Sequence, residues 1–210
     1  ERAHLEGETF SADGVTVVFH GISAHPGYAK GKMVSAIKAA AAFVAKLPAQ
    51  EWSPESTEKM EGFVHPTGME GVLEKATVSF IVRDFSTPML ATHEERLRRL
   101  VDETVREFPG ITTEFIIKEQ YRNMREVLDQ NPRVMEYAAE AYRRAGMEPN
   151  IMSIRGGTDG SRLSFMGLPC PNIFTGEMGI HSKQEYVSVQ DMEKAVETLV
   201  HLAQVWEEKS

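Results

Sequence analysis

The order of six periodic segments in the first part of the chain constrains the fold more than any other feature. Strand or helix periodicity appears in turn in residues 15–20, 32–47, 62–69, 72–85, 92–108 and 111–119. The first segment, VTVVFH, alternates as a strand does, and the second carries one apolar stripe at helical spacing before Pro48 ends it. The order strand, helix, strand, strand, helix, strand is the split βαβ pattern of ferredoxin-like sheets. We therefore predict an α+β domain here.

The helix boundaries in this region follow from capping residues and helix breakers. Thr92 and Glu95 have the spacing of a capping box, so we expect the second helix to begin at Thr92. Pro109 and Gly110 end that helix. The first helix is expected to span residues 32–47.

After Gln120 the chain changes to an alternation of short strands and helices. The predicted elements are a helix at residues 131–146, strands at 151–154, 169–174 and 185–189, a short helix at 158–167 and a final helix from Ser188. Such alternation is typical of α/β proteins, in which functional groups gather at the carboxyl ends of the strands. Arg155 and His181 both fall at positions of that kind.

Composition and charge exclude several classes of protein. The chain has 210 residues, a net charge of −8 and no apolar run of the roughly 18 residues that a membrane-spanning helix needs. The negative charge argues against a nucleic-acid surface. Cys170 is the single cysteine, so no internal disulfide can form, and residues 1–10 are too polar for a signal peptide. We expect a cytoplasmic protein without nucleic-acid or membrane partners.

Three motifs carry a resemblance to a known family. They are SAHPGYAKGKMVSA at residues 23–36, FIVRDF at 80–85, and RGGTDGSRLSFMGLPCPNIFTG at 155–176, which His181 and Glu185 follow. Together they resemble the peptidase T, or tripeptidase, branch of the co-catalytic zinc peptidases, a family that includes carboxypeptidase G and the aminoacylases. The resemblance covers the C-terminal half of the family's chain. It implies a hydrolase of tripeptidase or aminopeptidase type that cleaves short peptides with metal-activated water.

The resemblance also implies a division into domains. Residues 12–120 resemble the lid domain of the family, which carries the dimer contact, so a homodimer is implied. Residues 121–210 resemble the C-terminal part of the family's catalytic α/β domain. Residues 1–11 are expected to connect to an N-terminal half that lies outside this chain.

His181 resembles the family's C-terminal zinc ligand. From the residues alone, a solvated surface histidine is the simpler interpretation, although a neutral imidazole in a loop can bind zinc. The family's active site holds two zinc ions, and its other ligands and its general base come from segments that precede the lid. The pair Glu94-Glu95 cannot replace the family's Glu-Glu pair, because we place it at a helix start. The chain therefore offers at most one zinc ligand, and we expect it to be inactive alone.

Four more residues resemble positions that contact substrate in the family. His25 resembles the catalytic lid histidine that reaches across the dimer and polarises the scissile carbonyl. Arg83 and Arg155 resemble the substrate arginines, whose guanidinium groups can hold a carboxylate with two parallel bonds, and Asn123 resembles a further substrate contact. From the residues alone, His25 could equally cap a turn. Arg83 could pair with a carboxylate on a neighbouring strand, and Arg155 could pair with Asp159.

One departure from the family leaves the substrate class open. The tripeptidase run Gly-Gly-x-Asn-x-His stands here as GEMGIH, in which Glu177 replaces a glycine and Gly179 replaces the asparagine. An aminoacylase-like or dipeptidase-like relative is therefore one alternative. A non-catalytic module for dimerisation and substrate clamping is another. The Gly156-Gly157 turn lacks the spacing of a phosphate loop, so we reject a nucleotide site.

Overall fold

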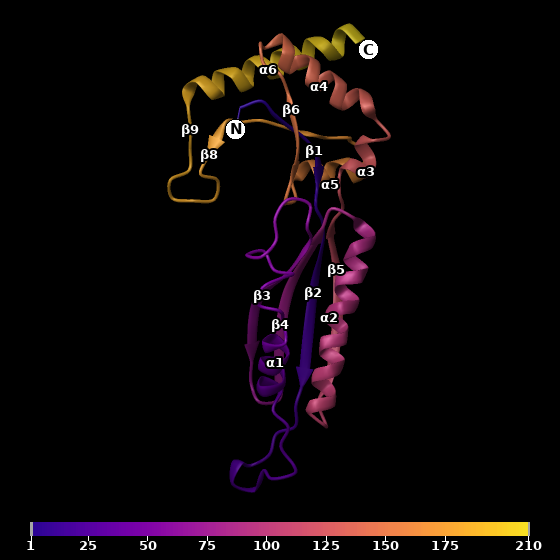
Figure 1. The fold of residues 1–210 in the computed structure, drawn as a ribbon, viewed down its shortest axis with the longest axis vertical. Coiled ribbons are helices and arrows are strands. Elements are labelled where there is room, and N and C mark those ends of the chain that lie inside the picture. The colour runs from indigo at the N-terminus through magenta and orange to yellow at the C-terminus, as the bar shows by residue number, and fades with distance from the viewer. Residues whose placement is uncertain (1, 210) are drawn as a thin grey trace. The chain divides into compact units, whose positions relative to one another are not determined.

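The computed structural model describes residues 2–209, which divide into two compact units (Figure 1). We call Ser11–Tyr121 the inserted unit, because it lies within one continuous stretch of the chain. The split unit is made from both ends of the chain, up to Phe10 and from Arg122 onwards. None of the helices among the described residues has the length and apolar run that crossing a bilayer requires.

The inserted unit is built on a four-stranded sheet. Its strands are β2 (Ser11–His20), β3 (Phe63–Gly71), β4 (Lys75–Asp84) and β5 (Thr112–Tyr121). They lie in the order β3-β4-β2-β5, and every neighbouring pair is antiparallel. The helices α1 (Ala36–Ala45) and α2 (Thr87–Glu107) pack against strands of this sheet. The connection from β2 through α1 to β3 passes over β4, and the connection from β4 through α2 to β5 passes over β2. The predicted ferredoxin-like fold is therefore confirmed.

Alternation along β4 separates the core from the open face of the sheet. Ala76, Val78, Phe80 and Val82 are buried, and the Phe43 ring of α1 lies 5.7 Å from the Phe80 ring. The residues between them, Thr77, Ser79, Ile81 and Arg83, are only partly buried. Successive side chains of a strand point to opposite faces, so Arg83 belongs to the face opposite the core.

Two predicted helix starts were wrong. The helix α2 begins at Thr87 after Ser86, with proline in its first turn, so Thr92 lies inside the helix and forms no capping box. Proline suits the first turn of a helix, and Leu90 extends the buried apolar stripe toward it. The helix α1 begins at Ala36 after the cap Ser35 rather than at residue 32, because the preceding Val34 forms a bridge with Ile22.

The split unit contains a small sheet and most of the helices. Its strands are β1 (His4–Thr9), β6 (Asn150–Ile154) and β7 (Asn172–Ile173), in the order β6-β1-β7, with a separate hairpin of β8 (Glu177–Met178) and β9 (Tyr186–Val187). Its helices are α3 (Arg125–Leu128), α4 (Pro132–Arg144), α5 (Asp159–Phe165) and α6 (Val189–Lys209). The strand β1 was not predicted. Residues 4–9 are the centre of a sheet, parallel to β6 and antiparallel to β7, and are more than a connector.

The core of the split unit gathers around Tyr142. Its ring lies 5.5 Å from the Phe174 ring, and both pack with Leu5 of β1. The Tyr142 hydroxyl donates to the His4 carbonyl at 2.6 Å and accepts from the Phe174 amide at 2.9 Å. Burial raises the pKa of Tyr142 to about 12. This hydroxyl therefore satisfies one backbone group of β1 and one directly after β7.

Much apolar surface of the split unit remains exposed. Fifteen of its large apolar side chains are exposed, against nine in the inserted unit: Ile151, Met152, Leu163, Phe165, Met166, Leu168, Met178, Ile180, Tyr186, Val187, Val189, Met192, Val196, Leu199 and Val200. Parallel strands are normally covered on both faces. The split unit has the surface of an incompletely covered α/β domain.

Candidate functional site

His25 lies in an exposed loop beyond the end of β2. The base of the loop is closed by backbone hydrogen bonds between Ile22 and Val34, 2.8 and 2.9 Å long. Gly21 is required there, because a Cβ atom would lie 2.4 Å from the Val34 carbonyl oxygen. Within the loop, the His25 Nδ1 accepts from the Gly27 amide at 3.1 Å and caps the short helix Pro26–Tyr28.

The cap fixes the tautomer of His25 as well as the turn. Because Nδ1 accepts a backbone hydrogen bond, the neutral ring carries its proton on Nε2. The ring is exposed, so this Nε2–H is a donor that faces outward. The sequence left two alternative roles for His25, capping a turn and polarising a carbonyl. Because Nδ1 makes the cap and Nε2–H stays a donor, one ring can perform both roles.

Arg83 stands near one end of the open face of the inserted sheet. Its guanidinium carbon lies 5.8 Å from the Phe63 ring centre, and its Nε is buried without a hydrogen-bond partner in the described part of the chain. Burial raises the pKa of the nearby Tyr121 phenol, and Arg83 acts in the opposite direction. This side chain thus keeps hydrogen-bonding capacity that the described residues do not use.

Asp84 follows Arg83 and points to the other face, where it joins a buried network. Its Oδ2 lies 2.9 Å from His93 Nε2, and its Oδ1 accepts from the Ser86 amide at 2.8 Å. The Trp52 indole donates to His93 Nδ1 at 2.8 Å. An indole N–H can only donate, so His93 Nδ1 accepts and His93 Nε2–H donates to Asp84. The network fixes the end of β4 beside Arg83, and no sequence pattern predicted it.

Arg155 lies directly after β6, at the carboxyl end of a strand as predicted. Its guanidinium carbon lies 5.2 Å from the Phe10 ring centre. The next residue, Gly156, accepts from the Phe10 amide through its carbonyl oxygen at 3.2 Å. Thr158 then caps α5. The arginine is therefore carried by a loop that is bonded to the end of β1.

Asn123 is placed differently from the other predicted site residues. It is 3% exposed, and its Oδ1 accepts from the amides of Thr9 at 3.2 Å and Arg125 at 3.0 Å. Its Nδ2 donates to Glu8 Oε1 at 3.3 Å. These contacts give Asn123 a structural task inside the split unit, and its contact with substrate stays a prediction.

His181 lies in the exposed hairpin loop between β8 and β9. Its amide donates to Glu185 Oε2 at 2.6 Å, and its φ angle is +62°. Non-glycine residues rarely adopt a left-handed backbone, and such strain tends to mark functional sites. Gly179, two residues before His181, also has a left-handed backbone, with a φ angle of +68°. Glycine and asparagine both tolerate this region, so the replacement of the family's asparagine by Gly179 leaves the backbone path available.

One hollow of the split unit brings the two loops of interest together. It has a volume of about 520 Å³ and is bordered by Thr158 and Asp159 from the Arg155 loop and by Gly176, Glu177 and Ile180 from the His181 loop. No group of three or more His, Cys, Asp or Glu within residues 2–209 is arranged to hold a metal ion. His181 is therefore a ligand candidate that belongs to no such group of three in the described residues.

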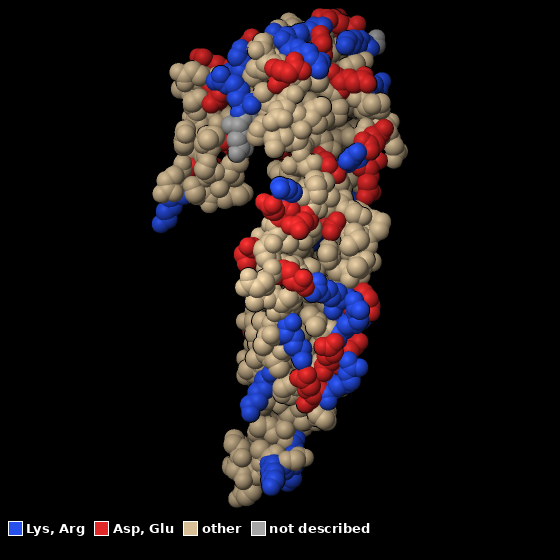
Figure 2. Space-filling view, in the orientation of Figure 1, with Lys and Arg blue, Asp and Glu red and all other residues tan. Residues whose placement is uncertain are grey.

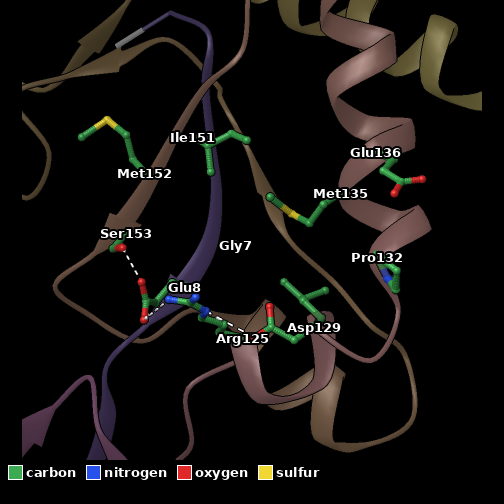
Figure 3. Close-up of a pocket in the computed structure, with 11 residues that line it drawn as sticks. Gly7, Glu8, Arg125, Asp129, Pro132, Met135, Glu136, Ile151, Met152 and Ser153 are labelled. Carbon is green, nitrogen blue, oxygen red and sulfur yellow. Dashed lines mark hydrogen bonds and ion pairs between the residues drawn. The ribbon is translucent and has the colours of Figure 1, made fainter.

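A second hollow of about 550 Å³ lies between β1, β6 and α4 (Figure 3). Its polar side is occupied by internal contacts: Ser153 donates to Glu8 Oε2 at 2.6 Å, and Arg125 joins Glu8 to Asp129 at 3.4 Å each. Its other side carries Met135, Ile151 and Met152, the last two exposed. Paired charges beside an open apolar wall indicate a packing surface rather than a catalytic centre.

Comparison with known proteins decides the family. A family model described as the peptidase dimerisation domain matches residues 7–111, half of the chain. The chain belongs to the M20 peptidase family. A peptidase T of Parabacteroides distasonis is 44% identical over 206 residues, which are 98% of this chain and 50% of that protein. The resemblance seen in the sequence to the peptidase T branch is thereby confirmed.

Solved structures of M20 proteins share the fold. A tripeptidase from Staphylococcus aureus superposes with a TM-score of 0.80 at 18% identity, over 98% of this chain and 54% of that one. A dinuclear metal-binding peptidase of the M20 family from Bacillus subtilis gives 0.69 at 17% identity, over 100% and 55%. The chain spans about half the length of the curated relatives it matches. The family model overlaps most of the inserted unit, and the solved structures match this chain over about half of their own length.

Proposed function

We propose that this chain is the dimerisation domain and the C-terminal part of the catalytic domain of a peptidase that hydrolyses short peptides. The M20 family membership and the peptidase T relatives support the reaction class. The exposed apolar surface of the split unit supports its assignment to part of a catalytic domain, because that surface needs a covering that the described residues do not provide. A cytoplasmic location belongs to the same proposal.

One observation within the inserted unit carries the proposal furthest. On β2, His20 pairs with Lys75, whereas Ala12 pairs with Arg83, eight residues further along β4. The loop between β2 and α1, which carries His25, extends beyond the His20 end of the sheet (Figure 1). At roughly 3.3 Å per strand residue the two ends lie about 26 Å apart, and an extended tripeptide spans only about 10 Å. His25 and Arg83 of one copy therefore cannot contact one short peptide.

A second copy resolves this separation. In a dimer, the loop of one protomer that carries His25 can reach the site that contains Arg83 of the other protomer. The outward Nε2–H of His25 would donate to the scissile carbonyl as negative charge develops there. Arg83 would hold a peptide carboxylate through paired charged hydrogen bonds, and Arg155 is the candidate for the same role in the split unit. These roles make the proposed enzyme an obligate dimer.

Zinc fits the complete enzyme but not the described chain alone. Among residues 2–209 only His181 is proposed as a ligand, and no cluster of three candidate ligands exists there. A co-catalytic pair needs several carboxylate and imidazole ligands. The remaining ligands and the general base would come from the half of the relatives that this chain does not span. The two metal ions would supply the activated water.

The proposal is tested by assaying two proteins side by side. The purified 210-residue chain should bind no zinc pair and hydrolyse no tripeptide, because its ligand set is incomplete. The same chain, joined to a first half of the length found in its relatives, should hydrolyse tripeptides and lose this activity in a chelator. Chelator-sensitive hydrolysis by the chain alone would contradict the division of the active site. Inactivity of a folded, zinc-loaded joined protein would favour the alternative of a non-catalytic dimerisation and clamping module.

The substrate class remains part of the proposal. Gly176 and Gly179 keep positive φ angles in the loop before His181, so the turn itself does not separate a tripeptidase from a dipeptidase or aminoacylase. Glu177 is the chemical difference, and its carboxylate accepts from the Thr175 hydroxyl at 2.5 Å. Comparing di-, tri- and N-acyl substrates on the joined protein decides between these alternatives.

The surface beside α1 is the expected dimer interface. This helix has one charged residue, Lys38, and its outward positions include Ile37 and Ala41. A surface helix that is apolar on its outer side needs a cover. In contrast, Lys and Arg mix with Asp and Glu along α2 (Figure 2). The neighbouring edge strand β3 exposes Met69. A second copy therefore packs here more favourably than against α2.

Sedimentation tests this interface directly. The chain should sediment as a dimer at micromolar concentration, and Ala41→Glu should convert it to a monomer, because the charge would be buried against the second copy. The matched control is Ile116→Glu on β5, the other edge of the sheet, which should leave the dimer intact. A wild-type monomer at every accessible concentration, or an Ala41→Glu dimer of unchanged affinity, would count against the interface.

Hydrogen exchange should distinguish the stability of the two units. Amides in β1, β6 and α6 are expected to exchange faster than those in β2 and β4, because the split unit exposes apolar faces that another segment should cover. Exchange of the isolated chain, read by mass spectrometry, gives the comparison. Equal protection in the two units would show that the split unit is stable without a cover.

A further inference from the structure

Three buried polar side chains of the split unit form one connected network. Thr9, Asn123 and Ser161 are 0%, 3% and 0% exposed. The Ser161 hydroxyl donates to Thr9 Oγ1 at 3.0 Å, and the Met124 amide donates to the same oxygen at 3.2 Å. Asn123 Oδ1 accepts from the Thr9 amide. The network thus joins the end of β1, the segment after residue 122 and the start of α5.

The network holds the Arg155 loop on both sides. Before the loop, Ile154 pairs with Thr9 in the sheet. After it, Thr158 and Ser161 form a reciprocal capping box with distances of 3.4 and 3.5 Å. Between these points, the Gly156 carbonyl accepts from the Phe10 amide. Ser161 bonds both to Thr158 of the loop and to Thr9 of β1.

We propose that Thr9, Asn123 and Ser161 are positioning residues that set the orientation of the Arg155 loop. Their hydroxyl and amide groups fix the backbone on either side of the arginine, so the guanidinium reaches a peptide carboxylate without first ordering the loop. The role in substrate recognition rests on the proposed peptidase function. The positioning itself is a property of the isolated chain.

A matched pair of serines separates positioning from general stability. Ser161 and Ser164 lie one turn apart on α5, and both are buried. Ser164 Oγ accepts from the Cys170 amide at 3.0 Å and does not belong to the network. Ser161→Ala and Ser164→Ala therefore each remove one buried hydroxyl, but only the first removes the hydroxyl that donates to Thr9 of β1.

Amide exchange of the 210-residue chain gives the first test. Ser161→Ala should speed exchange at Phe10 and Thr158 about three- to tenfold, as expected for the loss of a hydrogen bond, while the exchange of β2 amides stays unchanged. Ser164→Ala should speed exchange near Cys170 instead. Thr9→Val should repeat the Ser161→Ala effect, and Thr9→Ser should restore protection, because it keeps the hydroxyl. Unchanged exchange at Phe10 and Thr158 in Ser161→Ala would overturn the proposal.

Substrate selectivity of the joined protein gives the second test. Ser161→Ala should raise KM for tripeptides with a free C-terminal carboxylate about three- to tenfold and change kcat little, with a smaller effect on C-terminally amidated peptides. Ser164→Ala should affect both substrates alike. Equal losses on both substrates in Ser161→Ala would overturn positioning even if the protein is a peptidase. If the wild-type joined protein lacks peptidase activity, the proposed function fails, while the exchange result still decides whether the network orders the loop.

Discussion

In the joined protein on which the proposed function is tested, Arg155→Ala is expected to leave bound zinc unchanged and to lower kcat/KM for tripeptides by on the order of 2–3 kcal/mol, roughly 30- to 150-fold. The cause is the loss of charged hydrogen bonds between the guanidinium and the substrate carboxylate. The loss should shrink on amidated peptides, which offer no anion. His181→Ala is expected to lower zinc content and activity together, because it removes an imidazole ligand. Metal analysis and kinetics on both substrate forms provide the measurements.

Two control variants make these results specific. Arg162→Ala removes an exposed arginine from α5, and His65→Ala removes an exposed histidine from β3. Both should retain zinc and activity. Full zinc content in His181→Ala would refute the ligand assignment. If Arg155→Ala loses as much activity on the amide as on the free acid, Arg155 has a structural role only.

The ferredoxin-like order could be predicted because it depends on local patterns. Alternation along β4 and the apolar stripe of α1 are visible in short windows of sequence. The predicted start of α2 was wrong because the spacing of Thr92 and Glu95 also occurs within a helix, where these residues cap nothing. The proline in the first turn was the better signal for the helix start. Local patterns thus predict the type of an element more securely than its first residue.

The strand β1 could not be predicted because its contacts are distant in the sequence. Its segment HLEGET has one deeply buried apolar residue, Leu5, among polar ones. Its glutamates are satisfied by partners far along the chain: Glu6 by Asn172, and Glu8 by Ser153 and Arg125. A central strand with polar side chains has no alternation to detect. For the same reason the sequence could not reveal that Asn123 is buried.

For the candidate site, the sequence located two positions but not the network beside Arg83. The resemblance located Arg155 and His181, and the structure places them at a strand end and in a strained turn, while their roles stay predictions. The network in which His93 joins Asp84 to Trp52 could not be predicted, because nothing in the spacing of these residues distinguishes them from surface residues. It is nevertheless the contact that fixes the end of β4, next to Arg83.

Asp84→Ala is expected to lower the free energy of unfolding of the inserted unit by about 2–4 kcal/mol. The carboxylate accepts from the His93 ring and from the Ser86 amide, and its side chain is 11% exposed. Its removal leaves two donors without an acceptor in a buried place. Urea unfolding followed by Trp52 fluorescence measures the change, in a Trp206→Phe background so that one indole reports. The control Asp102→Ala removes an exposed carboxylate from α2 and should change the free energy by less than about 0.5 kcal/mol.

The neighbouring arginine supplies the reciprocal test. Arg83 and Asp84 point to opposite faces of β4, so their substitutions should have opposite consequences. Arg83→Ala is expected to leave the unfolding free energy within about 1 kcal/mol of the wild type, because its Nε has no partner in the described residues and the contacts that it loses are those with the Phe63 ring and the Tyr121 phenol. In the joined protein the same variant should weaken peptide hydrolysis. If Arg83→Ala destabilises the inserted unit as strongly as Asp84→Ala does, Arg83 is part of the structural network, and Arg155 becomes the remaining candidate for holding the substrate carboxylate.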